Sequence, residues 1–321
     1  MTLPRRLILA APALALGTAH AQTPGWTAAS EYPATSIPGE GVTFFAEAAT
    51  RRGVPVTAAP GAPDGYRSAA AFTALAQGRF AVADAFSGSL NAVDPMFLLS
   101  SLPFLTASYA DAARLRDLAR PHYATAAEKQ GAMLLWTTPW PPSGLWTKRP
   151  VTKPEDLQGL RVRTYDATGT AVLRAAGANA EVLSFAEVNA RLEAGTLDAV
   201  LSSGDGGAGR RLWRWLPNFT IADYAWPISL AFASKTALAA LPATGREAIT
   251  AAAAETETRQ WQAIEGRLAA NQRTMRENNV AIHEPTDALR AALRQAAASA
   301  TTAWEAQAGD AGRAILAAYR R

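Results

Sequence analysis

The sequence predicts an α/β protein built from two open sheets with a cleft between them. Three patterns support this prediction. An amino-terminal stretch alternates strand and helix signals, residues 145–201 repeat the alternation, and residues 242–279 have the period of one long helix. Alternating strands and helices favour open sheets, and a helix of that length is longer than one small domain. We therefore expect two lobes, each an open sheet flanked by helices, with the long helix bracing both.

The first block reads as strand, helix, strand, helix and strand. In that order, the elements are expected at residues 26–30, 41–52, 54–58, 68–77 and 79–86. An apolar run with the sequence FLLSSLPFL follows, and then a helix at residues 109–129 and a buried strand at 132–137. The next segment, PWPPSG, is rich in proline and glycine, so we expect a rigid, irregular loop.

The second block repeats the rhythm. Its strands and helices are expected at residues 145–147, 160–164, 168–176, 180–183, 186–194 and 197–201. Ser184 and Glu187 have the spacing of a capping box, and Gly195 has the place of a helix terminator. After the long helix, residues 280–283 read as a strand and residues 286–319 as one or two closing helices.

The amino terminus has the pattern of a secretory signal peptide. Arg5 and Arg6 precede the apolar run 7–16, and small residues ending at Ala21 follow, so cleavage is expected there. The run is about half of a bilayer span, which argues against a membrane anchor. The mature protein is therefore expected to be soluble in an exported compartment and not inserted in a membrane.

Composition and motifs exclude most catalytic chemistry. The chain has no cysteine, and the net charge of +4 is a near balance without a run of five like charges, which argues against a nucleic-acid partner. His122 and His283 lack metal-ligand spacing, and no G-x-S-x-G motif occurs. The glycine-rich residues 203–209 fit no phosphate-binding motif and suit either a sharp turn or a close approach to an anion. We expect neither enzymatic activity nor a metal or other cofactor.

Binding is the better interpretation. Arg163 lies near the end of the expected strand 160–164, at a cleft opening built from Thr, Tyr, Asp and Gly, where a guanidinium could hold a carboxylate through two parallel hydrogen bonds. The alternative is a structural ion pair with Asp166 or Asp198. Trp140 lies in the stiff loop PWPPSG, and pockets are commonly lined by aromatic side chains, so it is equally suited to the core and to a ligand.

Residues 154–198 resemble the extracytoplasmic solute-binding proteins of tripartite ATP-independent periplasmic (TRAP) transporters, the DctP family. The resemblance rests on a PEDLKG-like turn, a strand with an arginine near its end, an alanine-rich helix, a SEVY-like helix cap and the start of a last strand. The residues that carry it are Pro154, Asp156, Leu157, Gly159, Arg163, Gly177, Ala178, Ser184–Val188, Gly195 and Asp198. The order of elements also agrees from Trp26 to the carboxyl terminus.

The resemblance implies a two-lobed periplasmic binding protein that closes over an organic acid and delivers it to membrane permease subunits. It implies a periplasmic monomer in which Arg163 pairs with the ligand carboxylate. Beyond the signal peptide at 1–21, we expect lobe I at residues 22–143 and 228–268 and lobe II at 144–227 and 269–321. A ligand sensor for a signalling receptor and, less favoured, an exported enzyme acting on organic acids are the alternatives.

Two departures from the family pattern bear on the ligand. Ser202 stands where many members have asparagine, and the loop TPWPPSG lacks a second basic residue. A second ligand carboxylate would be poorly matched, so we expect a monocarboxylate with an apolar or aromatic body. The expected cleft residues are Arg163, Trp140, Tyr165, Asp166, Ser202, Asp205, Phe86, Ser87, Glu31, Tyr32, Ser36 and Tyr224.

Overall fold

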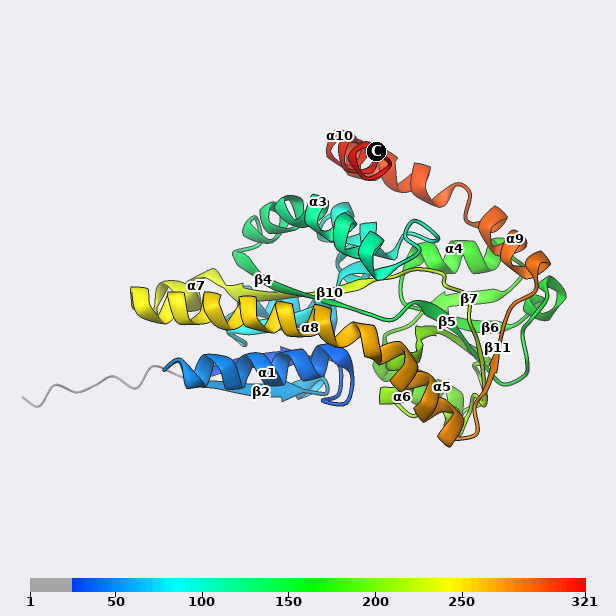
Figure 1. The fold of residues 1–321 in the computed structure, drawn as a ribbon, viewed down its shortest axis with the longest axis horizontal. Coiled ribbons are helices and arrows are strands. Elements are labelled where there is room, and N and C mark those ends of the chain that lie inside the picture. The colour runs from blue at the N-terminus through cyan, green and yellow to red at the C-terminus, as the bar shows by residue number, and fades with distance from the viewer. Residues whose placement is uncertain (1–24) are drawn as a thin grey trace, which may run out of the picture.

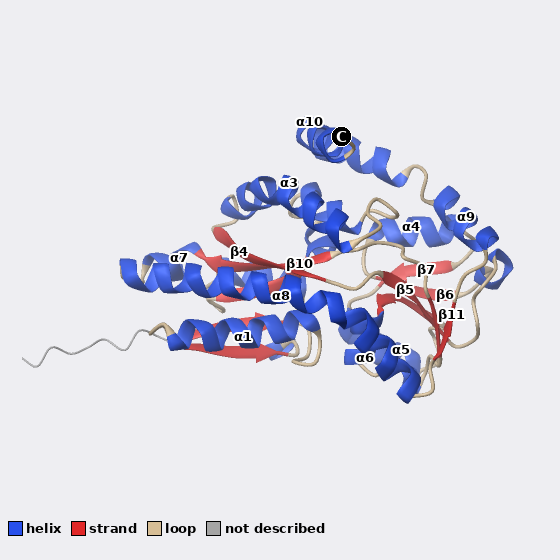
Figure 2. Cartoon of the chain, viewed as in Figure 1, coloured by secondary structure: helices blue, strands red, loops and turns tan. Residues whose placement is uncertain are grey.

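The computed structural model describes residues 25–321, which form two lobes, each built on its own β-sheet (Figure 1). The expected signal peptide at 1–21 lies outside the described residues. Helices cover both faces of each sheet (Figure 2), so each lobe is a three-layer α/β/α unit. The predicted two-lobed α/β class is confirmed. Among the helices of residues 25–321, none combines the length and the apolar composition that crossing a membrane requires.

Lobe I contains a five-stranded sheet in the order β2-β1-β3-β10-β4. The strands are β1 (Trp26–Ser30), β2 (Val56–Pro60), β3 (Val82–Phe86), β4 (Ala132–Pro139) and β10 (Ile228–Ser234). β1 is parallel to β2 and β3, whereas β10 runs antiparallel to both β3 and β4. β10, which is fully buried, was not predicted from the sequence. Its one signal is the alternation of Ile228, Leu230 and Phe232 with smaller residues.

Lobe II contains a six-stranded sheet in the order β11-β9-β5-β8-β6-β7. The strands are β5 (Ser143–Thr147), β6 (Arg161–Thr164), β7 (Asn179–Val182), β8 (Ala199–Ser203), β9 (Asn218–Thr220) and β11 (Ala281–His283). β6 is parallel to β7 and β8, so the three carboxyl ends meet at one edge. That edge faces lobe I and carries Arg163.

Ten α-helices surround the sheets of the described chain. They are α1 (Ile37–Arg51), α2 (Ser68–Ala76), α3 (Tyr109–Glu128), α4 (Ala167–Ala175), α5 (Phe185–Glu193), α6 (Gly204–Gly209), α7 (Lys235–Ala239), α8 (Ala243–Glu277), α9 (Asp287–Ala296) and α10 (Ala300–Tyr319). In lobe I, α2, α3 and α10 cover one face of the sheet and α1, α7 and α8 the other. In lobe II, α4 and α9 cover one face and α5 and the end of α8 the other.

The helix α8 is the predicted brace between the lobes (Figure 1). Its 35 residues span about 50 Å at 1.5 Å per residue. The amino-terminal part packs on α1 and β4 of lobe I, and the carboxyl-terminal part packs on α6 and β11 of lobe II. Ile249 and Ala252 join the core of lobe I, whereas Met275 joins a core of lobe II. One rigid element therefore belongs to both lobes.

Several expected boundaries differ. α1 begins at Ile37 and not at residue 41, because Ser36 takes the cap position and Pro38 is tolerated in a first turn. β2 begins two residues later than expected. The loop PWPPSG is shorter than expected, because β4 runs through Pro139 and β5 begins at Ser143.

The carboxyl-terminal segment, expected wholly in lobe II, divides between the lobes. α9 packs on α4 of lobe II, but α10 packs on α3 of lobe I. The reason is the apolar face of α10, since Trp304, Ile315 and Leu316 are buried in a core of lobe I. We therefore place residues 300–319 with lobe I.

The glycine cluster forms a short helix, α6, and not a sharp turn. Ser203 caps it by accepting a hydrogen bond from the backbone N–H of Gly206 at 3.0 Å. A methyl group at Gly207 would lie 2.1 Å from Cε2 of Trp146, and one at Gly209 would lie 2.4 Å from Oγ of Ser36 in lobe I. Glycine is needed here because an aromatic ring and the other lobe approach the backbone closely.

The Gly207→Ala exchange is expected to destabilise the protein. The added methyl group collides with the buried Trp146 ring, and such overpacking costs about 1–3 kcal/mol. Gly266→Ala is the matched control, because Gly266 lies in α8 with nothing within 4 Å of its added Cβ. That control should gain roughly 0.5–1 kcal/mol from helix propensity. Chemical unfolding of both variants measures the difference, and equal stabilities would contradict the packing argument.

Candidate functional site

A cavity lies between the lobes at the carboxyl end of β6. It encloses about 330 Å³ of space outside atoms, a figure that includes solvent at its opening. Its walls are mostly aromatic, with one cation and three serine side chains. The lining residues are Tyr32, Phe86, Trp140, Ser143, Arg163, Tyr165, Phe185, Ser202, Ser203, Gly206 and Pro227.

Arg163 is the charge at the centre of this cavity. Its side chain leaves β6 and is only 4% exposed. Its Nε donates to the carbonyl of Leu183 at 2.8 Å, and its Nη1 donates to the carbonyl of Leu201 at 3.2 Å. Burial lowers the pKa of the guanidinium to about 10, so it remains charged at neutral pH. The two carbonyls therefore fix the orientation of the group without neutralising it.

No acidic side chain neutralises Arg163 in the part of the chain that the structure describes. Its guanidinium forms no salt bridge, and the sequence-based alternatives, Asp166 and Asp198, are bound elsewhere. Burying a cation without a counterion is unfavourable in free energy, and the ligand-free protein bears that cost. The N–H groups of Arg163 that do not bind the carbonyls of Leu183 and Leu201 can hold a carboxylate through two parallel hydrogen bonds.

Aromatic rings form the apolar walls of the cavity. Trp140 is 4% exposed, and its Nε1 donates to Oγ of Ser229 at 3.0 Å. The ring of Tyr32 meets it edge-on at 4.7 Å. Phe86 of lobe I and Tyr165 of lobe II contact each other between the lobes, with their ring centroids 5.0 Å apart. A compact apolar body therefore fits between these rings better than a long or highly hydroxylated one.

Six of the predicted ligand residues line the cavity: Arg163, Trp140, Tyr165, Ser202, Phe86 and Tyr32. The other six lie outside its lining. Glu31 accepts from the N–H and the hydroxyl of Ser68 at the start of α2, and Ser87 donates to the carbonyl of Phe97. Ser36 stands at the cap position of α1, and Tyr224 packs edge-on against Phe104. Asp166 and Asp205 each have a distinct structural role.

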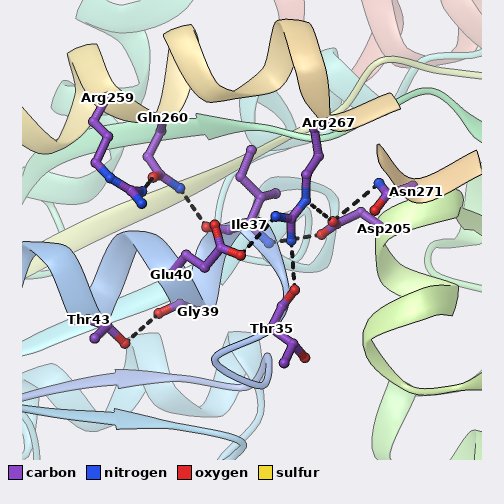
Figure 3. Close-up of polar contacts among 10 residues, drawn as sticks. All are labelled: Thr35, Ile37, Gly39, Glu40, Thr43, Asp205, Arg259, Gln260, Arg267 and Asn271. Atoms are coloured by element: carbon purple, nitrogen blue, oxygen red, sulfur yellow. Dashed lines mark hydrogen bonds and ion pairs between the residues drawn. The ribbon is translucent and has the colours of Figure 1, made fainter. Parts of the chain in front are cut away.

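Asp205 joins the lobes beside the cavity (Figure 3). Its Oδ2 accepts from the backbone N–H of Ile37, at the start of α1, at 2.8 Å. Its Oδ1 accepts from Nε of Arg267 and from the amide of Asn271, both in α8. Arg267 also donates to Glu40 of α1 at 2.8 Å. The carboxylate thus ties α6 of lobe II to α1 and to the brace α8.

Asp166 caps the helix α4 directly after the strand that carries Arg163. Its Oδ1 accepts from the N–H of Gly169 at 2.7 Å, whereas Oδ2 is buried without a hydrogen-bond partner. Burial raises the pKa of this carboxyl to about 7. Asp166 is therefore largely protonated in weakly acidic solution.

Two residues beside Arg163 were not predicted from the sequence. Phe185 lines the cavity and lies under the guanidinium of Arg163, with Cζ 4.8 Å from the ring centroid. Arg210 covers Phe185 as well, at 4.7 Å. Phe185 belongs to the segment Ser184–Val188, whose pattern predicts only a helix start, and Arg210 directly follows the glycine-rich residues 203–209. Within residues 25–321 no His, Cys, Asp and Glu side chains gather into a group that could hold a metal ion.

A protein family model matches residues 62–307, and its description is bacterial extracellular solute-binding protein, family 7, or DctP. Among curated protein sequences, none matches the chain.

Solved structures resemble the chain over nearly its whole length. DctP7 of Bordetella pertussis, an extracytoplasmic solute receptor binding pyroglutamic acid, is 27% identical, with a TM-score of 0.88 over 92% of this chain and 99% of that one. DctP6 of the same organism, also binding pyroglutamic acid, is 25% identical, with a TM-score of 0.87 and the same coverage. A TRAP solute-binding protein of Desulfovibrio desulfuricans with bound sn-glycerol-3-phosphate is 20% identical, covers 92% and 97% of the two chains, and has a TM-score of 0.83. The fold is therefore compatible with ligands other than monocarboxylates.

Asp205→Ala is expected to lower the free energy of unfolding by about 3–5 kcal/mol, because it leaves Arg267 and the N–H of Ile37 without their buried acceptor. Glu40→Gln is the matched control. Glu40 contacts the same Arg267 but is partly exposed, so its loss should cost about 0–1 kcal/mol. Chemical denaturation compares the two, and equal losses would refute the central role of Asp205.

The raised pKa of Asp166 predicts a pH-dependent stability. The folded carboxyl keeps its proton up to about pH 7, whereas the unfolded one loses it near 3.8, so stability falls as pH rises between these values. Asp166→Asn keeps the cap and removes this titration. Between pH 5 and pH 8, the variant should lose roughly 1–3 kcal/mol less stability than the parent.

Thermal unfolding across this pH range provides the measurement. Asp198→Asn serves as the control, because the hydrogen bond from Arg161 lowers the pKa of Asp198 to about 2, far below the window. Profiles of Asp166→Asn and the parent that superimpose would exclude Asp166 as the titrating group.

Proposed function

The chain belongs to family 7 of the bacterial extracellular solute-binding proteins, the DctP family, and we propose that it captures a small monocarboxylate, with pyroglutamate as the first candidate. The observation that carries this proposal is the buried guanidinium of Arg163, which has no acidic partner among the described residues. A ligand carboxylate would supply the missing counterion. The family consists of solute-binding proteins, and a receptor role needs no catalytic group at this site.

The walls of the cavity favour this ligand. Pyroglutamate combines one carboxylate with a compact five-membered lactam ring, which matches one buried cation surrounded by aromatic rings. The rings of Tyr32, Trp140 and Tyr165 would cover the lactam, while the serine hydroxyls could bind its amide. Two solved relatives at 27% and 25% identity bind pyroglutamic acid. Their likeness supports the proposal for this chain.

Binding and transport would be linked through the lobes. Because Tyr32 and Phe86 come from lobe I and Arg163 and Phe185 from lobe II, a ligand in the cavity touches both sides and favours their closed arrangement. We infer that the exported protein acts in the periplasm as a monomer and presents the closed, loaded form to the membrane permease subunits of a TRAP transporter. An open, empty form would then be released.

Arg163→Gln is expected to weaken pyroglutamate binding at least about a hundredfold, because the ligand loses two charge-assisted hydrogen bonds. The unfolding temperature of the ligand-free protein should not fall, since an uncompensated buried charge is removed. Isothermal titration calorimetry and thermal unfolding give the two readouts.

Arg161→Gln is the matched control on the same strand. Arg161 pairs with Asp198 at 2.6 Å at the other end of β6, away from the cavity, so its loss should leave the affinity for pyroglutamate unchanged. An Arg163→Gln protein that binds pyroglutamate within threefold of the parent would refute the role of Arg163. A parent protein that binds other carboxylates but not pyroglutamate would refute only the named ligand.

A further inference from the structure

Two guanidinium groups enclose the ring of Phe185. Cζ of Arg163 lies 4.8 Å from the ring centroid, and Cζ of Arg210 lies 4.7 Å from it. Arg163 comes from β6 and Arg210 directly follows α6, so both belong to lobe II. Phe185 is itself 5% exposed. A cation beside an aromatic ring is stabilised, but two cations sharing one ring also repel each other.

Arg210 reaches across the lobe interface. Its Nη2 donates to the backbone carbonyl of Glu31 in lobe I at 3.0 Å, and its Nε is buried without a hydrogen-bond partner. Within residues 25–321, no carboxylate lies within salt-bridge distance of Arg210. Arg161, Arg191 and Arg267, by contrast, each form a salt bridge. Burial lowers the pKa of Arg210, which reflects the unfavourable loss of water around its charge. The contact with Glu31 therefore joins lobe II to lobe I.

The groups that face the two arginines leave an excess of positive charge. The carboxylate of Glu31 is near both, but it already accepts two hydrogen bonds from Ser68. Burial raises the pKa of the Tyr32 hydroxyl, so this group stays neutral. Asp166, beside Arg163, has a pKa of about 7 and is committed to the cap of α4. One ligand carboxylate on Arg163 would offset the excess.

We propose that Arg210 is a positioning residue that makes closure of the lobes depend on a negative charge in the ligand. Without an anion, closure brings Arg210 into a dry interface beside the charged Arg163 and is disfavoured. With a carboxylate on Arg163, the repulsion is offset and Arg210 reaches the carbonyl of Glu31. The charge of Arg210 thus adds to the preference for an acid over a neutral molecule of the same shape, without contact to the ligand. This inference rests on the proposed binding of a carboxylate at Arg163.

Two variants isolate the charge of Arg210. Arg210→Lys keeps a positive charge and an N–H donor, whereas Arg210→Gln keeps a donor without the charge. Both lose the guanidinium, so a difference between them reports the charge and not the shape. Arg210 belongs to none of the four large apolar cores of the described chain, and both variants are expected to fold.

The chain offers a clean way to measure closure because it contains no cysteine. Glu47→Cys on α1 and Ala175→Cys on α4 place one exposed label on each lobe. Electron–electron double resonance between nitroxide labels at these two positions gives the closed fraction of the ligand-free protein. Calorimetry on the unlabelled variants gives the affinities for pyroglutamate and for its neutral carboxamide.

The Arg210→Gln protein should close more often without ligand than the Arg210→Lys protein. Its ratio of acid to amide affinity should be lower than that of Arg210→Lys by at least about fivefold. Equal ligand-free closed fractions in the two variants would overturn the proposal, whatever their affinities. If the parent binds no pyroglutamate, the proposed ligand is wrong, while the ligand-free comparison still decides the role of Arg210.

Discussion

The guanidinium of Arg163 is buried between two lobes and forms no salt bridge within residues 25–321, and the surroundings of the cavity follow from that constraint. The carbonyls of Leu183, directly after β7, and of Leu201, within β8, orient the group from the two strands that flank β6 and leave its charge intact. Such an arrangement is unfavourable in isolation, because a desolvated cation needs a counterion. An acidic side chain next to Arg163 would form a structural ion pair and compensate the charge within the protein. Because no such pair forms here, an anionic ligand is needed to compensate the charge, as is expected of a receptor.

The relative position of the lobes depends on a different set of residues from those that line the cavity. Asp205, Arg267 and Glu40 connect α6, α8 and α1 just outside it. Because α8 belongs to the cores of both lobes, any change in their relative position must pass through this helix or the chain crossings beside it. The return of α10 onto lobe I adds a further crossing of the chain between the lobes. The cavity is therefore bounded by a polar junction that is sensitive to lobe movement.

Close packing in α6 connects this junction to the ligand site. Gly207 lets the backbone rest on Trp146, and Gly209 lets it approach Ser36 of the opposite lobe. The same short helix places Gly206 in the cavity wall, Asp205 against α1 and Arg210 above Phe185. Six consecutive residues thus contribute to packing, to the lobe junction and to the charge near the ligand. A bulkier sequence in this helix would separate these three features.

Local patterns in the chain were sufficient for the α/β class and for the brace α8, because helix period and strand–helix alternation are visible in consecutive residues. They offered Arg163 as a candidate cation, but an ion pair with Asp166 or Asp198 was an equally local alternative, and only the contacts of its guanidinium separate the two. Local patterns did not reveal β10, whose small residues weaken its strand signal although it lies between β3 and β4. They also did not separate Trp140 and Tyr32, which line the cavity, from Glu31 and Asp205, which bind backbone N–H groups. That distinction, and the pairing of Arg163 with Arg210 around Phe185, depend on contacts between residues that are distant in sequence. Only the packing of the two lobes creates those contacts, since burial and charge compensation are properties of the assembled interface and not of any one segment.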